Sequence, residues 1–248
     1  MSRTLSLLFA IVCYAIFFAT FLYLVAFVGE LPVPQTVDRP PSDLAPAIAA
    51  IVDIALVMLF GLQHSLMARP WFKRGWARIV PPVIERSAYV LCASIALLLL
   101  FWFWQPIEGT VWMVPATMQW LAYIVMALFW TGFGIVLVST FLINHFELFG
   151  LHQAWLHVMG YETEPPELRQ PLFYRWVAHP LYAGFFLAFW ATPHMTYGHL
   201  LLALALSTYM LIAIRYEEHD LTNVFGEEYR RYRSGVGMLL PRFRRRSA

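Results

Sequence analysis

The sequence predicts an all-α membrane protein: a polytopic bundle of five to six membrane segments, the last two a helical hairpin, followed by a cytoplasmic C-terminal segment. Three observations predict this class. Of the 248 residues, 60% are hydrophobic and only 13% are charged, whereas soluble domains are about half apolar and about a quarter charged. The apolar residues fall into runs of about 20, the length that a helix needs to cross a bilayer. Basic residues are dense in alternate connections between these runs, as the positive-inside rule requires.

The N-terminal part of the chain contains four such runs. The first follows the basic Arg3 and is longer than the apolar core of a signal peptide, which has about 7–15 residues. We therefore expect it to be retained as a first span. The four predicted spans lie at about 5–28, 46–67, 87–105 and 117–142, within residues 1–142 of a single membrane domain that extends over 1–248.

The last apolar stretch, 181–214, is too long for one span. Pro193 and Gly198 lie in its middle and oppose a continuous helix. This pattern predicts a hairpin of two short helices of about 16 residues, each rising about 24 Å, which gives six crossings in all. A shallow re-entrant hairpin is the alternative. The hairpin belongs to the second part of the domain, 143–248, with a cytoplasmic loop before it and the C-terminal segment after it.

The distribution of basic residues predicts the orientation. The connection 68–86 and the C-terminal tail are basic, whereas the connections 29–45 and 106–116 carry only Arg39. The positive-inside rule places the basic segments in the cytoplasm, so both termini are expected there, in agreement with six crossings. The basic residues are Arg69, Lys73, Arg74, Arg78 and Arg86 in the connection, and Arg230, Arg231, Arg233, Arg242, Arg244, Arg245 and Arg246 in the tail.

Composition also bounds the partners. We expect the basic run from Arg242 to Arg246 to fix the topology and to contact anionic membrane lipid, and nucleic acid is not expected on so short a tethered tail. Cys13 and Cys92 both lie in apolar runs, which argues against a disulfide framework or a zinc site. The chain contains no P-loop, no G-x-S-x-G elbow and no H-E-x-x-H pair. The oligomeric state is left open, because no extended a/d repeat is visible.

Polar residues gather at the expected cytoplasmic ends of the spans. His179 and Tyr182 open the hairpin in FYRWVAHPLYAG, and Glu217 and Glu218 close it in EEHDL. The two arms of a hairpin return to one face of the membrane, so these residues are expected to be neighbours. Adjacent helical residues point about 100° apart. We therefore expect one acid to bind a ligand and the other to pair with Arg215 or a tail arginine, without deciding which.

At these residues the sequence resembles a family, the integral-membrane methyltransferases that include isoprenylcysteine carboxyl methyltransferase and the phospholipid methyltransferases. The motifs AHPLYAG, EEHDL and GEEYRRY carry this resemblance. Four further stretches resemble the bacterial branch that methylates methanethiol: FGLQHSLMARP, STFLINHFELFGLHQAW, FWATPHMTYGHLLLA and YRRYRSGVGMLLPR. Together they extend the resemblance over nearly the full length.

The resemblance implies an enzyme of the bacterial inner membrane with S-adenosyl-L-methionine as methyl donor, a small volatile thiol as acceptor and dimethyl sulfide as product. In one respect the sequence departs from the family, which usually has arginine directly before the His–Pro pair. Ala178 occupies that position here, and Arg175 lies four residues before His179. The residues expected to bind the cofactor are Tyr174, His179, Tyr182, Glu217, Glu218 and Tyr229.

The acceptor side is expected at His64, Asn144 and His145, at the ends of the second and fourth spans. A small thiol is mostly protonated at neutral pH, and only the thiolate is strongly nucleophilic. A histidine with a pKa near about 6.5 can accept the thiol proton, and which histidine does so is left open. Two other functions remain: a methyltransferase acting on a lipid or prenylcysteine, and a non-enzymatic membrane protein of nitric oxide metabolism.

Overall fold

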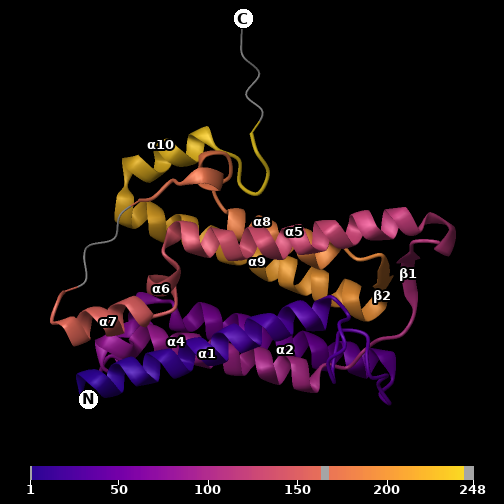
Figure 1. Ribbon diagram of the computed structural model, residues 1–248, viewed down its shortest axis with the longest axis horizontal. Helices are drawn as coiled ribbons and strands as arrows, with labels where there is room; N and C mark the ends of the chain where they lie inside the picture. The colour runs from indigo at the N-terminus through magenta and orange to yellow at the C-terminus, as the bar shows by residue number, and fades with distance from the viewer. Residues whose placement is uncertain (1, 163–167, 243–248) are drawn as a thin grey trace, which may run out of the picture.

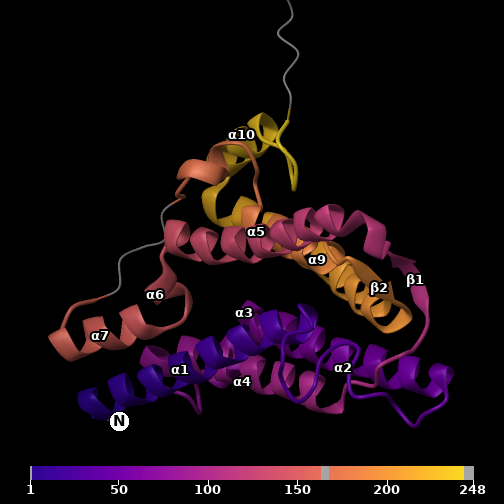
Figure 2. The same ribbon diagram turned by 45° about the vertical axis from the view of Figure 1, so that its right-hand side comes forward.

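The computed structural model describes residues 2–162 and 168–242, and its helices form two layers (Figure 1; Figure 2). One layer contains α1, α2 and α4, and the other contains α5, α8 and α9. Within the described residues, five helices are long and apolar enough to cross a membrane, and α8 is a shorter apolar helix. The predicted all-α class and four N-terminal spans are confirmed. The helices are α1 (Arg3–Val28), α2 (Pro46–Met67), α4 (Pro82–Phe103), α5 (Gln119–Ile143), α8 (Pro180–Trp190) and α9 (Tyr197–Phe225).

Short elements lie at the ends of the layers. We call the end where α1 begins and α9 ends the near end, and the end that holds the strands the far end (Figure 1). The basic tail residues Arg244, Arg245 and Arg246 lie outside the described residues, so their contact with lipid stays a prediction. The short elements are α3 (Pro70–Trp76), α6 (His145–Leu148), α7 (Leu151–Met159), η2 (Leu172–Arg175) and α10 (Glu227–Gly235) at the near end, and β1 (Thr110–Met113), η1 (Ala116–Met118) and β2 (His194–Thr196) at the far end.

Proline and capping residues set where the helices begin. Pro46, Pro82 and Pro180 each occupy the first turn of a helix, where the missing N–H has no partner to lose. The Thr196 hydroxyl caps α9 by accepting a hydrogen bond from the His199 backbone N–H at 3.0 Å. The third span was expected to begin near residue 87, but α4 begins at Pro82. The proline starts the helix, and a charged first turn then precedes the apolar run.

The hairpin has two very unequal arms. α8 has 11 residues and α9 has 29, so the expectation of two helices of about 16 residues is wrong. At 1.5 Å per residue, α8 rises about 16 Å, roughly half of a bilayer core. α8 begins at Pro180, where the hairpin was expected to open, and ends at Trp190, whereas α9 continues past the apolar stretch to Phe225. α8 and α9 still form a hairpin, and α8 lies along α5 (Figure 1).

Glycines allow the two helices of the second layer to approach closely. A Cβ atom on Gly132 of α5 would lie 2.7 Å from the Gly184 carbonyl oxygen of α8, and the reverse distance is also 2.7 Å. Small residues of this kind are typical of helix contacts in membranes. This contact holds the short α8 against α5 along its length, and it fixes the position of the residues at the start of α8.

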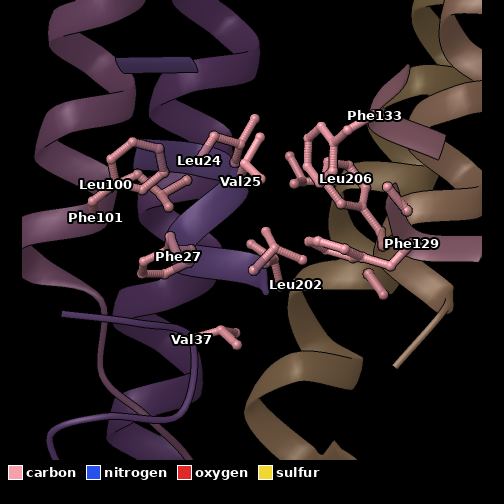
Figure 3. Packing of buried hydrophobic residues seen from close by; sticks show 14 of the residues in the cluster. Leu24, Val25, Phe27, Val37, Leu100, Phe101, Phe129, Phe133, Leu202 and Leu206 are labelled. Carbon is pink, nitrogen blue, oxygen red and sulfur yellow. The ribbon is translucent and has the colours of Figure 1, made fainter. Parts of the chain in front are cut away.

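Apolar side chains from both layers meet in a common core (Figure 3). Leu24 and Val25 of α1 face Phe133 of α5 and Leu206 of α9 in this view, whereas Phe27 lies on the α4 side, with its ring centroid 5.0 Å from that of Phe101. Aromatic rings pack edge to face within it, with ring centroids 5.1 Å apart for Phe129 and Phe133. The core joins the two layers over the half of the bundle next to the far end.

The far end is tied together by features that the sequence did not predict. β1 pairs antiparallel with β2, so the connection after α4 is joined to the turn of the hairpin. The Trp104 indole N–H donates to the Val37 carbonyl at 3.0 Å, and the Thr196 hydroxyl donates to the Asp38 carboxylate. Short loops between apolar spans gave no strand signal, because the pairing joins residues about 80 positions apart.

Asp38 makes the stability of the far end depend on pH. Burial raises the pKa of this carboxyl to about 6, above its ordinary value of about 3.9. The folded protein therefore binds this proton more tightly than the unfolded chain, and the resulting stabilisation is lost as pH rises through about 6. We expect Asp38→Asn, which keeps an acceptor for Thr196, to remove this loss in thermal unfolding of the detergent-solubilised protein. The exposed Asp43→Asn is the matched control and should retain it.

Candidate active site

A cavity of about 610 Å³ lies between the two layers on the near-end side of the core. Sites for drug-sized ligands have volumes of roughly 300–1,000 Å³. The lining is mainly apolar, with polar side chains from both layers facing into it. Asn144, Glu218 and Tyr229 are not among the lining residues. Six residues that the sequence singled out line this one cavity: His64, His145, Tyr174, His179, Tyr182 and Glu217.

The two adjacent acids of α9 have different surroundings. Glu217 lines the cavity, and its carboxylate lies beside the Tyr182 hydroxyl and 4.0 Å from His179 Nδ1. Glu218 accepts hydrogen bonds from Arg233 Nε and from His179 Nε2, the latter at 3.1 Å. The pairing of one acid with a tail arginine was predicted, and the structure identifies Glu218 as that acid. Glu217 is the acid that remains available to a ligand.

Backbone pairing with the C-terminal segment holds His179 in place. The His179 backbone N–H donates to the Met238 carbonyl at 3.1 Å, directly after a parallel bridge between Val177 and Gly237. The imidazole is buried, and its ring is edge-on to Tyr182 at 5.7 Å between centroids. The start of α8 and the segment after α10 are therefore one structural unit. The contacts of His179 with Glu217 and Glu218 bring the AHPLYAG and EEHDL motifs together, as predicted.

α10 is attached to the same unit through its tyrosines. The Tyr232 hydroxyl donates to the Tyr174 carbonyl at 2.8 Å, and burial raises the pKa of Tyr232 to about 12. Tyr229 is buried, and burial also raises its pKa. Its hydroxyl has no hydrogen-bond partner among the described residues. A buried unpaired hydroxyl is costly, so Tyr229 leaves a polar group beside the acids that a ligand could satisfy.

On the first layer, His64 carries a ring nitrogen without a partner. Its Nε2 lies 2.8 Å from the Tyr89 hydroxyl of α4, and its Nδ1 is buried and unpaired among the described residues. The Arg86 guanidinium lies over the Tyr89 ring, 5.2 Å from the centroid, and its Nε donates to the Leu148 carbonyl at 2.7 Å. His64, Arg86 and Tyr89 all line the cavity.

His145 is different, because both of its ring nitrogens are engaged. Thr140 Oγ1 lies 2.8 Å from Nδ1 and donates its own proton to the Leu137 carbonyl. Nδ1 must then donate to Thr140, which leaves Nε2 to accept from the Tyr14 hydroxyl at 2.8 Å. The ring also stacks on Phe141 at 4.1 Å, and burial lowers the pKa of His145. His145 is thus held as a neutral part of the cavity wall.

Asn144 makes local contacts only. Its side-chain oxygen accepts from the Glu147 backbone N–H at 3.4 Å and caps the short helix α6, and its amide donates to the Glu147 carboxylate at 2.6 Å. The backbone has a φ of 146°, which asparagine tolerates better than most residues. These contacts orient the turn that presents His145, and the predicted catalytic role of Asn144 is not tested by them.

Several residues of the site were not predicted as such. Tyr89 and Tyr14 hold two of the three cavity histidines, His64 and His145, and both tyrosines lie in spans where tyrosine is common for packing and interface reasons. Their hydroxyls could have been suspected only from polar groups placed well inside apolar runs. Arg175, which the sequence offered in place of the missing arginine at Ala178, is exposed and does not line the cavity. The cavity arginines are Arg69, which pairs with Asp220 at 3.2 Å, and Arg86.

Comparison with known proteins gives the family. Methanethiol S-methyltransferase 1 of Bradyrhizobium diazoefficiens is 47% identical over 239 residues, covering 96% of this chain and 83% of the relative. Methanethiol S-methyltransferase of Mycobacterium tuberculosis is 48% identical over 242 residues, covering 97% and 98%. Nurim of Bos taurus is 32% identical over 191 residues, covering 73% and 71%. No family model matches the chain, and no solved structure matches it.

The resemblance inferred from the motifs is confirmed by these relatives. The identities above 45% extend over almost the whole chain and over most of each bacterial relative. They therefore include both layers of the bundle and every element that lines the cavity. This membrane protein belongs to the methanethiol S-methyltransferase family.

Proposed function

We propose that the protein transfers a methyl group from S-adenosyl-L-methionine to methanethiol and forms dimethyl sulfide. The reaction takes place in the near-end cavity, on the cytoplasmic side of a bacterial inner membrane, with both termini in the cytoplasm. The observation that carries the proposal is the composition of this cavity: His64, whose Nδ1 is buried without a partner among the described residues, and Glu217, whose carboxylate is available, line the same apolar space.

The residues of the cavity fit this cofactor. S-adenosyl-L-methionine presents an ammonium group, a sulfonium group, hydroxyls and an aromatic base, and when bound it would supply an electrophilic methyl group. The Glu217 carboxylate suits the cationic groups, and the faces of Tyr174 and Tyr182 suit the sulfonium. Behind the cavity lining, the buried hydroxyl of Tyr229, unpaired among the described residues, lies close to both acids. The volume of about 610 Å³ is large enough for a ligand of this class.

His64 is the residue that we assign as the base. The S–H bond of methanethiol breaks as its proton passes to His64 Nδ1, and the electron pair stays on sulfur. His64 can do this because Nδ1 has no partner among the described residues, whereas both nitrogens of His145 are engaged. The Arg86 guanidinium lies over the Tyr89 ring and lines the same cavity, and its positive charge favours the thiolate over the thiol.

The remaining cavity residues position the reactants. The apolar lining excludes water, and such an environment increases the effect of each charge on the reacting atoms. The displacement needs the attacking thiol sulfur, the methyl carbon and the leaving sulfonium sulfur in one line. A cavity that holds the reactants in this alignment would supply much of the rate. Glu218, His179 and Arg233 form the structural link that keeps Glu217 and the C-terminal segment at the wall.

Two measurements on the purified full-length protein test this function. Calorimetry should detect binding of S-adenosyl-L-methionine, and headspace gas chromatography should detect dimethyl sulfide when methanethiol is added. A protein that binds the donor but methylates only lipid or prenylcysteine would have a different acceptor. Absence of donor binding to folded protein would contradict the proposal and favour a non-enzymatic role.

A further inference from the structure

Tyr89 makes two contacts with the same residue, His64. Its hydroxyl oxygen lies 2.8 Å from the ring nitrogen Nε2 and 3.4 Å from the backbone carbonyl oxygen of His64. A hydroxyl has one proton to donate and lone pairs to accept. The protons of this pair can therefore be arranged in two ways, and only one of them leaves His64 able to act as a base.

In the first arrangement Tyr89 donates to Nε2, so the neutral ring carries its proton on Nδ1. That nitrogen would be a buried N–H donor without an acceptor, and it could not take a proton from a thiol. In the second arrangement Nε2–H donates to the Tyr89 oxygen, and the Tyr89 hydroxyl donates to the His64 carbonyl. Every polar atom of Tyr89 is then satisfied, and Nδ1 presents a lone pair.

We propose that Tyr89 is a positioning residue of the methyl transfer: it accepts from His64 Nε2, donates to the His64 carbonyl, and so keeps the lone pair on Nδ1 of His64, a residue that lines the cavity. Tyr89 does not touch the reacting atoms in this scheme. The proposal rests on the proposed function of the cavity, and it adds the tautomer of His64 and the residue that sets it.

Tyr89 is itself held in a fixed orientation. The Arg86 guanidinium lies over its ring at 5.2 Å and is fixed by its bond to the Leu148 carbonyl, at the end of α6. The other charged and titratable groups that line the cavity around His64 are Arg69 after α2, His145 on α6, Tyr174 on η2, His179 before α8, Tyr182 on α8, and Tyr209, Glu217 and Asp220 on α9.

The Tyr14–His145 pair provides a matched control within the same molecule. Tyr14→Phe and Tyr89→Phe each remove one phenol oxygen 2.8 Å from a histidine Nε2. Of these two histidines, His64 is the one with a ring nitrogen that has no partner in the described part of the chain. Steady-state kinetics of both variants, with S-adenosyl-L-methionine and methanethiol over a range of pH, therefore separate loss of positioning from loss of any buried hydroxyl.

We expect Tyr89→Phe to lower kcat about threefold to tenfold, the effect of one net hydrogen bond, with KM for both substrates unchanged. Without the acceptor at Nε2 the protonated ring is less favoured, so the acid limb of the kcat/KM profile should move to lower pH by about half a unit to one unit. Tyr14→Phe should keep the wild-type profile. An unchanged profile in Tyr89→Phe, or equal effects in both variants, would overturn the proposal.

A second measurement does not depend on the folding of any variant at Tyr89. Nitrogen chemical shifts of the ¹⁵N-histidine-labelled full-length protein in micelles report the tautomer of each neutral histidine. The His64 signals are assigned by their loss in His64→Gln. A proton on Nε2 supports the proposal, and a proton on Nδ1 contradicts it. If His64→Gln itself remains fully active, the assignment of the base fails as well, which is a distinct result.

Discussion

His64→Gln should lower kcat by about 100- to 10,000-fold, the usual contribution of a general base, while binding of S-adenosyl-L-methionine stays at the wild-type level. The physical reason is that His64 is the cavity histidine whose ring nitrogen has no partner among the described residues. Glutamine keeps the approximate size and polarity of the side chain but cannot accept a proton at neutral pH. Rapid-quench or headspace assays of dimethyl sulfide, with calorimetry of the donor, measure the two quantities separately.

His145→Gln is the matched comparison, because His145 lines the same cavity. This change removes a ring held by Thr140 and Tyr14, so we expect a loss of thermal stability of about 1–3 kcal/mol from unsatisfied buried groups. Turnover of the folded fraction should fall much less than in His64→Gln. If His145→Gln abolishes turnover and His64→Gln preserves it, the base is His145 and the assignment to His64 is wrong.

The two acids of α9 should give opposite results when each is changed to glutamine. Glu217→Gln should weaken binding of S-adenosyl-L-methionine about tenfold to a hundredfold, since a hydrogen bond to a charged group contributes about 1.5–3 kcal/mol. Its thermal stability should remain close to that of the wild type, because Glu217 is not the partner of Arg233. Calorimetry and thermal unfolding of the same preparation test both statements.

Glu218→Gln should instead loosen the C-terminal segment. The side chains of Glu218 and Arg233 are only 23% and 29% exposed, so the change leaves a partly buried cation with a weaker acceptor. We expect a lower unfolding temperature and faster trypsin cleavage in α10, at Arg230 or Arg231. Donor binding that falls more in folded Glu218→Gln than in Glu217→Gln would show that the roles of the two acids are reversed.

Much of the fold could be predicted, because the bilayer imposes a simple rule on sequence. Four runs of about 20 apolar residues predicted four spans, and α1, α2, α4 and α5 confirm them. The unequal hairpin could not be predicted. α9 extends through the polar EEHDL motif to Phe225, beyond the apolar stretch from which its length was predicted. The far-end sheet was not predicted because it pairs residues about 80 positions apart, and no local pattern encodes such a pairing.

The candidate site was predicted in its parts but not in its connections. Hairpin topology correctly brought His179, Glu217 and Glu218 together, since the two ends of a hairpin meet. Adjacent positions on a helix implied different roles for the two acids, but only the position of Arg233 identifies which acid is which. The partners of the histidines, Tyr89 and Tyr14, depend on how four helices pack, α1, α2, α4 and α6, so the sequence alone could not choose between His64 and His145.

The most direct test of the account follows the methyl group itself. Purified protein is supplied with methanethiol and S-adenosyl-L-methionine deuterated in its transferred methyl group, and the headspace is analysed by gas chromatography with mass spectrometry, beside His64→Gln at equal donor occupancy. The account predicts dimethyl sulfide that carries the complete deuterated methyl group from the wild-type protein, and a signal reduced by at least about 100-fold from His64→Gln. Unlabelled dimethyl sulfide, label recovered only in lipid, or equal signals from the two proteins would contradict it.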